Sequence, residues 1–160
     1  MNTPLHITLG ILAYNEREMI GRTVRSLFEQ SVFSGVGATL PDVQWEIIVV
    51  PNGCKDDTHA QAEQALQAAC TNSKTAGVSW RVVSLERPGK SHAWNKLVHE
   101  IAAPQTDAFL MIDADIEFGH TETIANSVQR LRSDDHAWTA ADTPLTDFQR
   151  PRSTTGSATL

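Results

Sequence analysis

The sequence predicts an α/β protein with a Rossmann-like, mostly parallel sheet and helices on both faces. Short apolar runs alternate with segments whose apolar residues recur at helical spacing, in the order β-α-β-α-β-α-β-α. Most of the runs are continuous, as expected for parallel strands that are buried on both faces. Each run ends in a polar segment, and ligands bind at the carboxyl ends of the strands in such sheets.

Chain length, charge and cysteine content limit the classes of protein to which the chain can belong. The chain has 160 residues, of which 41% are hydrophobic, enough for one domain with a real core. Its formal net charge of −6 argues against a nucleic-acid partner. Cys54 and Cys70 form neither a disulfide framework nor a zinc site, which favours reduced thiols in a cytoplasmic protein. We expect no secretory signal and no transmembrane segment.

The first strand is predicted over residues 7–13, an apolar run rich in β-branched residues. Asn15 is predicted to cap a helix over residues 16–30. The helical spacing is carried by Ile20, Val24, Leu27 and Phe28.

The second strand is predicted over residues 45–50, after a loop over residues 34–44 that contains two glycines and a proline. Pro51 ends the strand. A helix then follows over residues 58–69, and Asp56 lies near its positive N-terminal end.

A third strand is predicted over residues 78–85 and an amphipathic helix over residues 91–102. A buried strand ending at Asp113 and a helix over residues 121–132 follow, with a last strand over residues 136–141. We therefore expect an α/β domain over residues 1–142 and an irregular tail over residues 143–160.

The fourth strand runs directly into two carboxylates, Asp113 and Asp115. Like charges at this separation are unfavourable unless a positive group lies beside them. Oxygen ligands of this kind suit Mg²⁺ or Mn²⁺. Although an isolated Asp-X-Asp is usually a solvated turn, its position after a buried strand favours a metal site.

The sequence does not match the motifs of three other α/β classes that bind or hydrolyse phosphates. The turn after the first strand has no glycine, whereas a dinucleotide-binding fold requires Gly-X-Gly-X-X-Gly there. Gly89-Lys90-Ser91 lacks the earlier glycine of a phosphate loop, since that position is Ser84. Phosphatases with an Asp-X-Asp nucleophile carry it after the first strand, and here it follows the fourth.

Taken together, the strand-end segments resemble the family 2 glycosyltransferases of the GT-A fold, over roughly residues 7–132. The motifs occur in the family's order, and four in register are far more specific than any one alone. The matching residues are Ala13-Tyr14-Asn15-Glu16, Val49-Val50-Pro51-Asn52-Gly53-Cys54-Lys55-Asp56-Asp57-Thr58, Gly89-Lys90 with Ala93 and Asn95, and Asp113-Ala114-Asp115.

The resemblance implies that Ala13, Tyr14 and Glu16 line the base and ribose site. Asn52 and Gly53 belong to the nucleotide loop. Family members often carry an aspartate that reads the base where this chain has Asn52. An asparagine can both donate and accept, so base contact is retained while the choice of base is left open.

By the same resemblance, Lys90 offsets the charge of the nucleotide, Asp113 approaches the ribose or the metal, and Asp115 ligates Mg²⁺ or Mn²⁺. The expected reaction is inverting transfer of a sugar from a nucleotide-diphosphate sugar to an acceptor hydroxyl. No residue is marked as the general base, and Asp142 and Asp147 carry no distinguishing feature.

Plainer interpretations stay open for single residues. Glu16 would also suit a first helical turn, Asn52-Gly53 an ordinary turn, and Lys90 a solvated helix start. For the whole chain, the alternatives are a non-catalytic nucleotide-sugar-binding half-domain and a non-binding structural remnant that self-associates. We expect the N-terminal half of a transferase, with a homo-oligomer or a missing C-terminal half, and the family also allows a location peripheral to a membrane.

Overall fold

The computed structural model describes residues 4–33, 40, 42–72 and 78–133. Four parallel strands form one sheet in the order β3-β2-β1-β4. The strands are β1 (Leu5–Ala13), β2 (Val43–Pro51), β3 (Val78–Val82) and β4 (Ala108–Asp113). This arrangement confirms the predicted α/β fold with a parallel sheet.

The two central strands, β1 and β2, pair along their whole length, from Leu5 opposite Val43 to Ala13 opposite Pro51. Both are buried over their carboxyl-terminal halves, because helices cover each face there. The continuous apolar runs of the sequence therefore correspond to the two strands in the middle of the sheet.

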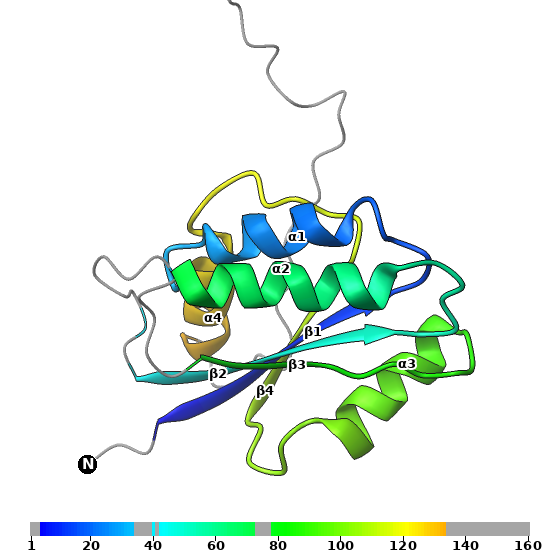
Figure 1. Cartoon of the computed structure of the whole chain (residues 1–160). Helices are drawn as coiled ribbons and strands as arrows, with labels where there is room; N and C mark the ends of the chain where they lie inside the picture. Colours follow the sequence, from blue (N-terminus) through cyan, green and yellow to red (C-terminus); the bar gives the residue numbers. More distant parts are fainter. Residues whose placement is uncertain (1–3, 34–39, 41, 73–77, 134–160) are drawn as a thin grey trace, which may run out of the picture.

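Helices α1 (Ile20–Phe28), α2 (Thr58–Asn72) and α4 (Thr123–Arg132) cover one face, and α3 (Lys90–Lys96) covers the other, as Figure 1 shows. The larger core lies on the first face. Its fully buried side chains from these three helices include Ile20, Val24, Leu27, Leu66 and Ile124.

On the second face, α3 continues as the π-helix η1 (Leu97–Ile101). The backbone N–H of Ala102 donates to the carbonyl of Leu97, five residues earlier. Leu97 packs directly on the sheet over Gly10, where an added Cβ would lie only 2.2 Å from a Leu97 methyl carbon. Gly10 is thus the point at which the helix can approach the sheet this closely.

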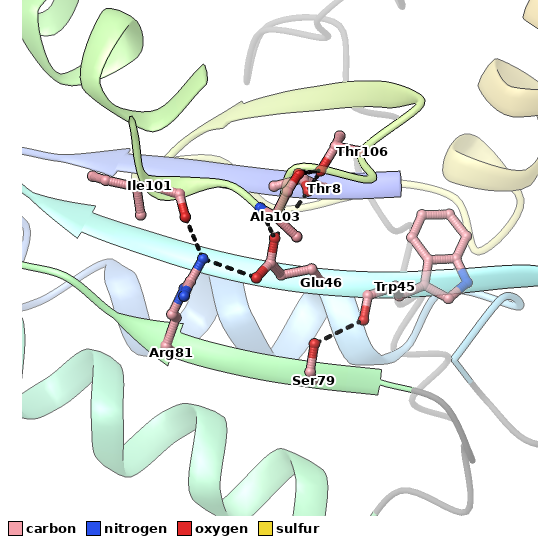
Figure 2. A network of polar contacts seen from close by, with 8 residues as sticks. All are labelled: Thr8, Trp45, Glu46, Ser79, Arg81, Ile101, Ala103 and Thr106. Carbon is pink, nitrogen blue, oxygen red and sulfur yellow. Dashed lines mark hydrogen bonds and ion pairs between the residues drawn. The ribbon is translucent and has the colours of Figure 1, made fainter. Parts of the chain in front are cut away.

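Away from α3, the same face carries a polar network centred on Glu46 (Figure 2). Its carboxylate accepts hydrogen bonds from the Thr8 hydroxyl at 3.1 Å and the Ala103 backbone N–H at 3.1 Å. It also lies 2.9 Å from the Arg81 guanidinium, which in turn donates to the Ile101 carbonyl. One side chain therefore joins β1, β2, β3 and the segment that leads into β4.

Several predicted boundaries are wrong. Helix α1 begins at Ile20 rather than at residue 16, and its N-cap is Met19. Asn15 does not cap this helix, because it has a positive φ of 56° and its side chain accepts a hydrogen bond from the Lys55 N–H instead. Strand β3 ends at Val82, although bridging continues to Leu85 opposite Asn52.

The other helices begin and end near their predicted bounds, with α2 extending to Asn72 and the helix predicted over residues 91–102 divided into α3 and η1. The predicted strand over residues 136–141, the tail over residues 143–160, Asp142 and Asp147 lie outside the described residues. Within the described ranges, no helix is long and apolar enough to cross a membrane.

Candidate functional site

The polar segments at the ends of the strands converge on one cavity of about 400 Å³. It lies between the carboxyl ends of β1 and β4 and the turn that precedes α3. The residues that line it are Leu12, Tyr14, Glu16, Asn52, Pro88, Gly89, Lys90, Asp113, Ala114 and Asp115.

The position of the cavity follows from the topology. Strand β1 is followed by α1 on one face of the sheet, whereas β4 is reached through α3 on the other face. The strand order thus runs from β1 to β2 and β3 and then returns to β4 on the other side of β1. Strands β1 and β4 meet where this order reverses, which is the switch point at which open α/β sheets bind ligands.

Lys90 and Asp113 meet across this cavity. The Lys90 ammonium lies 2.5 Å from a carboxylate oxygen of Asp113, and both side chains are at least half exposed. Lys90 is the first residue of α3 and Asp113 the last residue of β4. The pair places one positive group among the carboxylates of the cavity.

Glu16 carries the clearest electrostatic signature of the site. Its pKa is raised above the ordinary value of 4.5, first by burial and then by the negative charges of Asp115 and Asp56. Glu16 and Asp115 therefore lie close enough for their negative charges to interact, and both line the cavity.

The backbone of Glu16 is held by the first residue of α2, Thr58. Its backbone N–H donates to the Thr58 hydroxyl at 2.8 Å, and the Thr58 N–H donates to Asp56 at 3.1 Å. Burial raises the pKa of Asp56, but its hydrogen bonds from Thr58 and from the Arg17 N–H outweigh that effect and lower it overall. The turn after β1 is thereby fastened to the start of α2.

Two predicted nucleotide-binding residues, Ala13 and Gly53, are not among the residues that line the cavity. Ala13 is fully buried, and its carbonyl accepts hydrogen bonds from the backbone and the side chain of Asn52. Gly53 has φ +66°, and an added Cβ there would lie 2.6 Å from Pro88. Asn52 does reach the cavity, but it is only 3% exposed.

Reasoning from sequence did not select Leu12, Pro88, Gly89 or Ala114 as lining residues. Pro88 and Gly89 could have been found, because they directly precede Lys90 in the segment between the third predicted strand and the helix that follows it. Leu12 and Ala114 are apolar neighbours of predicted residues and carried no signal of their own.

The described residues contain no group of three or more His, Cys, Asp or Glu side chains that could hold a metal ion by themselves. The cavity does present two carboxylates, Asp113 and Asp115, from one strand end. A second cavity of about 290 Å³ lies at the opposite end of the strands and includes His6, Thr8 and Glu46, but none of the predicted site residues.

The fold and the cavity together define an α/β protein with a carboxylate-lined cavity at the carboxyl ends of a parallel sheet. The chain belongs to glycosyl transferase family 2, whose family model matches residues 8–155. A search of curated proteins gives no match.

Solved structures with the GT-A fold resemble the chain. A mannosyltransferase from Pyrobaculum calidifontis, solved with GDP-Man and Mn²⁺, superposes with a TM-score of 0.60 at 21% identity over 78% of this chain. Residues 1–349 of TarS from S. aureus give 0.56 at 18% identity over 81% of this chain. The same TarS fragment with UDP-GlcNAc gives 0.53 at 20% identity over 81%.

The matched region is only part of each of these structures. The chain spans 32% of the mannosyltransferase, 33% of TarS 1–349 and 32% of its complex. At these identities the likeness establishes the fold, and the reaction of this chain has to be argued from its own residues.

Proposed function

We propose that the chain is the donor-binding part of a glycosyltransferase that transfers a sugar from a nucleotide-diphosphate sugar to an acceptor hydroxyl, with inversion. The observation that carries the proposal is the gathering of Lys90, Glu16, Asp113 and Asp115 around one cavity. Membership of glycosyl transferase family 2 supports it. The complexes of the two structural neighbours, with GDP-Man and Mn²⁺ and with UDP-GlcNAc, are consistent with a donor of this class.

The cavity offers complementary groups for each part of such a donor. Tyr14 is 51% exposed beside the cavity and gives an aromatic face on which a base can stack. The Glu16 carboxylate, which also lines the cavity, would accept hydrogen bonds from ribose hydroxyls. The Lys90 ammonium is a mobile point charge suited to a diphosphate oxygen.

Asp113 and Asp115 fit a site for Mg²⁺ or Mn²⁺ that is shared with a phosphate. Mg²⁺ is commonly held by one or two carboxylates together with substrate phosphates and water, rather than by a cage of protein ligands. The unfavourable proximity of Asp115 to Glu16 would be relieved by such a cation.

The chemistry explains why these residue types are needed. Negative charge develops on the diphosphate as the bond to the sugar breaks, and fixed positive groups lower the barrier by stabilising it. Lys90 would supply one such group directly. A bound divalent cation would supply Lewis-acid stabilisation of the leaving group.

Titration calorimetry with UDP and GDP, each with and without Mn²⁺, tests donor binding. We expect Mn²⁺-dependent binding to the native chain and a loss of about tenfold or more in Asp115→Asn. Asp107→Asn is the matched control, because Asp107 precedes β4 at the opposite end and its replacement retains an oxygen that can accept from the His6 N–H. Equal binding by both variants would contradict the assignment of Asp115.

A second candidate is donor binding without transfer. The observation that favours it is that the chain spans about one third of its structural neighbours. Release of nucleoside diphosphate from UDP-sugars and GDP-sugars separates the two functions. Release that depends on Asp115 supports an enzyme, whereas binding without release supports a non-catalytic donor-binding domain.

A further inference from the structure

Asn52 is a buried polar residue that joins two of the segments forming the cavity. Its side-chain N–H donates to the Ala13 carbonyl at 2.7 Å, and its side-chain oxygen accepts from the Gly89 N–H at 2.9 Å. The side chain is therefore held between the end of β1 and the turn before α3.

The chemistry of the two partners fixes the orientation of this amide. A carbonyl can only accept and a backbone N–H can only donate, so the amide nitrogen must face Ala13 and the oxygen must face Gly89. A carboxylate at this position could still accept from Gly89, but its other oxygen would face the Ala13 carbonyl without a proton to share.

Gly89 directly precedes Lys90 and so sets the position of the lysine backbone. It lies just before α3 with φ 137°, a conformation that favours glycine. Its neighbour Pro88 packs against Gly53. Because Lys90 follows immediately, the bond from Gly89 to Asn52 determines where the lysine stem starts. From that start the ammonium reaches Asp113.

We propose that Asn52 is a positioning residue for Lys90: by fixing the Gly89 N–H it holds the lysine in the cavity, and it does not select the base. This inference rests on the proposed function, since it concerns the same donor site. It differs from base reading in two ways. Loss of Asn52 should weaken all nucleotides equally, and it should have little effect once Lys90 is absent.

The first test uses the protein without ligand. Amide hydrogen exchange at Gly89 is measured by NMR in the native chain, Asn52→Ala and Asn52→Asp. We expect exchange about tenfold or more faster in Asn52→Ala, and near-native exchange in Asn52→Asp, which retains the acceptor. Unchanged exchange in Asn52→Ala would overturn the proposal, and so would fast exchange in a folded Asn52→Asp.

The second test is a double-mutant cycle on affinity for UDP and GDP in the presence of Mn²⁺. We expect Asn52→Ala to weaken both nucleotides by about tenfold in the native background and by less than about twofold in Lys90→Met. A loss that differs between UDP and GDP, or that persists in Lys90→Met, would show direct base contact and overturn the proposal. If the native chain binds neither nucleotide, the proposed function fails, and the Gly89 exchange result still decides whether Asn52 fixes this turn.

Discussion

The Lys90 ammonium lies 2.5 Å from a carboxylate oxygen of Asp113, although the two residues belong to different elements, α3 and β4. Lys90 thus pairs with a carboxylate to which a divalent cation could also bind. Both side chains are largely exposed, so the pair itself adds little to stability. If Asp113 helps to hold a cation as proposed, we expect the lysine and the cation to compete for it in the ligand-free protein.

Lys90→Met should therefore bind Mn²⁺ alone more tightly, by roughly threefold, and bind UDP or GDP with Mn²⁺ more weakly, by roughly tenfold. The first change removes a competitor and the second removes a phosphate ligand. Electron paramagnetic resonance of unbound Mn²⁺ measures the first, and calorimetry the second. Lys96→Met is the control, because Lys96 pairs with Glu100 on the same helical segment. Changes of the same sign in both affinities would contradict this account.

Asp115→Asn should lower the pKa of Glu16 toward 4.5, because it removes one of the negative charges that raise it. Burial, the largest cause, remains and keeps the pKa above that value. Carboxyl-carbon NMR titration measures the change. Asp113→Asn is the comparison, since Asp113 is not among the causes, and an equal shift in both variants would refute the assignment.

The same shift predicts the direction of a pH dependence. Since folding raises the pKa of Glu16, its favourable contribution to stability is complete below pH 4.5 and is lost as the pH rises through the folded-state pKa. At neutral pH the ionised Glu16 is unfavourable, and Mn²⁺ with nucleotide should raise the melting temperature more at pH 7 than at pH 4.5. An equal rise at both values would be inconsistent with a cation beside Glu16.

Gly53→Ala should destabilise the protein by about 2–4 kcal/mol, because Gly53 has φ +66° and its added Cβ would meet the backbone of Pro88 at 2.8 Å. Urea unfolding measures the change. Gly21→Ala is the control, since nothing lies within 4 Å of its added Cβ in helix α1. That variant should be neutral or more stable by up to about 1 kcal/mol. Similar values for the two variants would argue against a close approach of Pro88.

Glu46→Gln should destabilise the protein by about 1–3 kcal/mol, because the charge opposite Arg81 is lost in a partly buried network (Figure 2). Glu63→Gln, on the exposed surface of α2, should change the free energy of unfolding by no more than about 0.5 kcal/mol. Chemical denaturation of both variants measures the difference, and comparable losses would mean that the network contributes little.

The sheet was predictable because its two central strands are continuous apolar runs in the sequence. The runs that became β1 and β2 are apolar on both faces, and only burial between helices accommodates such a run. The cavity was predictable for the same reason. Once the strands are parallel, Tyr14, Asn52 and Asp113 must lie at one edge of the sheet, and all three line it.

The features that could not be predicted from the sequence depend on contacts between residues far apart in the chain. Asparagine is a common helix N-cap residue, yet the side-chain oxygen of Asn15 accepts a hydrogen bond from the Lys55 N–H instead. The close approach of Leu97 to Gly10, at the start of the π-helix, is also a contact between distant residues that no local sequence pattern indicates. The role of Asn52 is likewise visible only once Ala13 and Gly89 are seen on either side of it.

The most direct test of the donor site is paramagnetic broadening of amide signals by Mn²⁺ in the presence of UDP or GDP. We expect the signals of Tyr14, Gly89 and Asp115 to broaden first, because these residues line the proposed cavity. Signals of His6 and Thr8, at the second cavity, should stay sharp at the same Mn²⁺ concentration. Broadening centred on the second cavity, or none that depends on nucleotide, would contradict a metal-dependent donor site at the ends of β1 and β4.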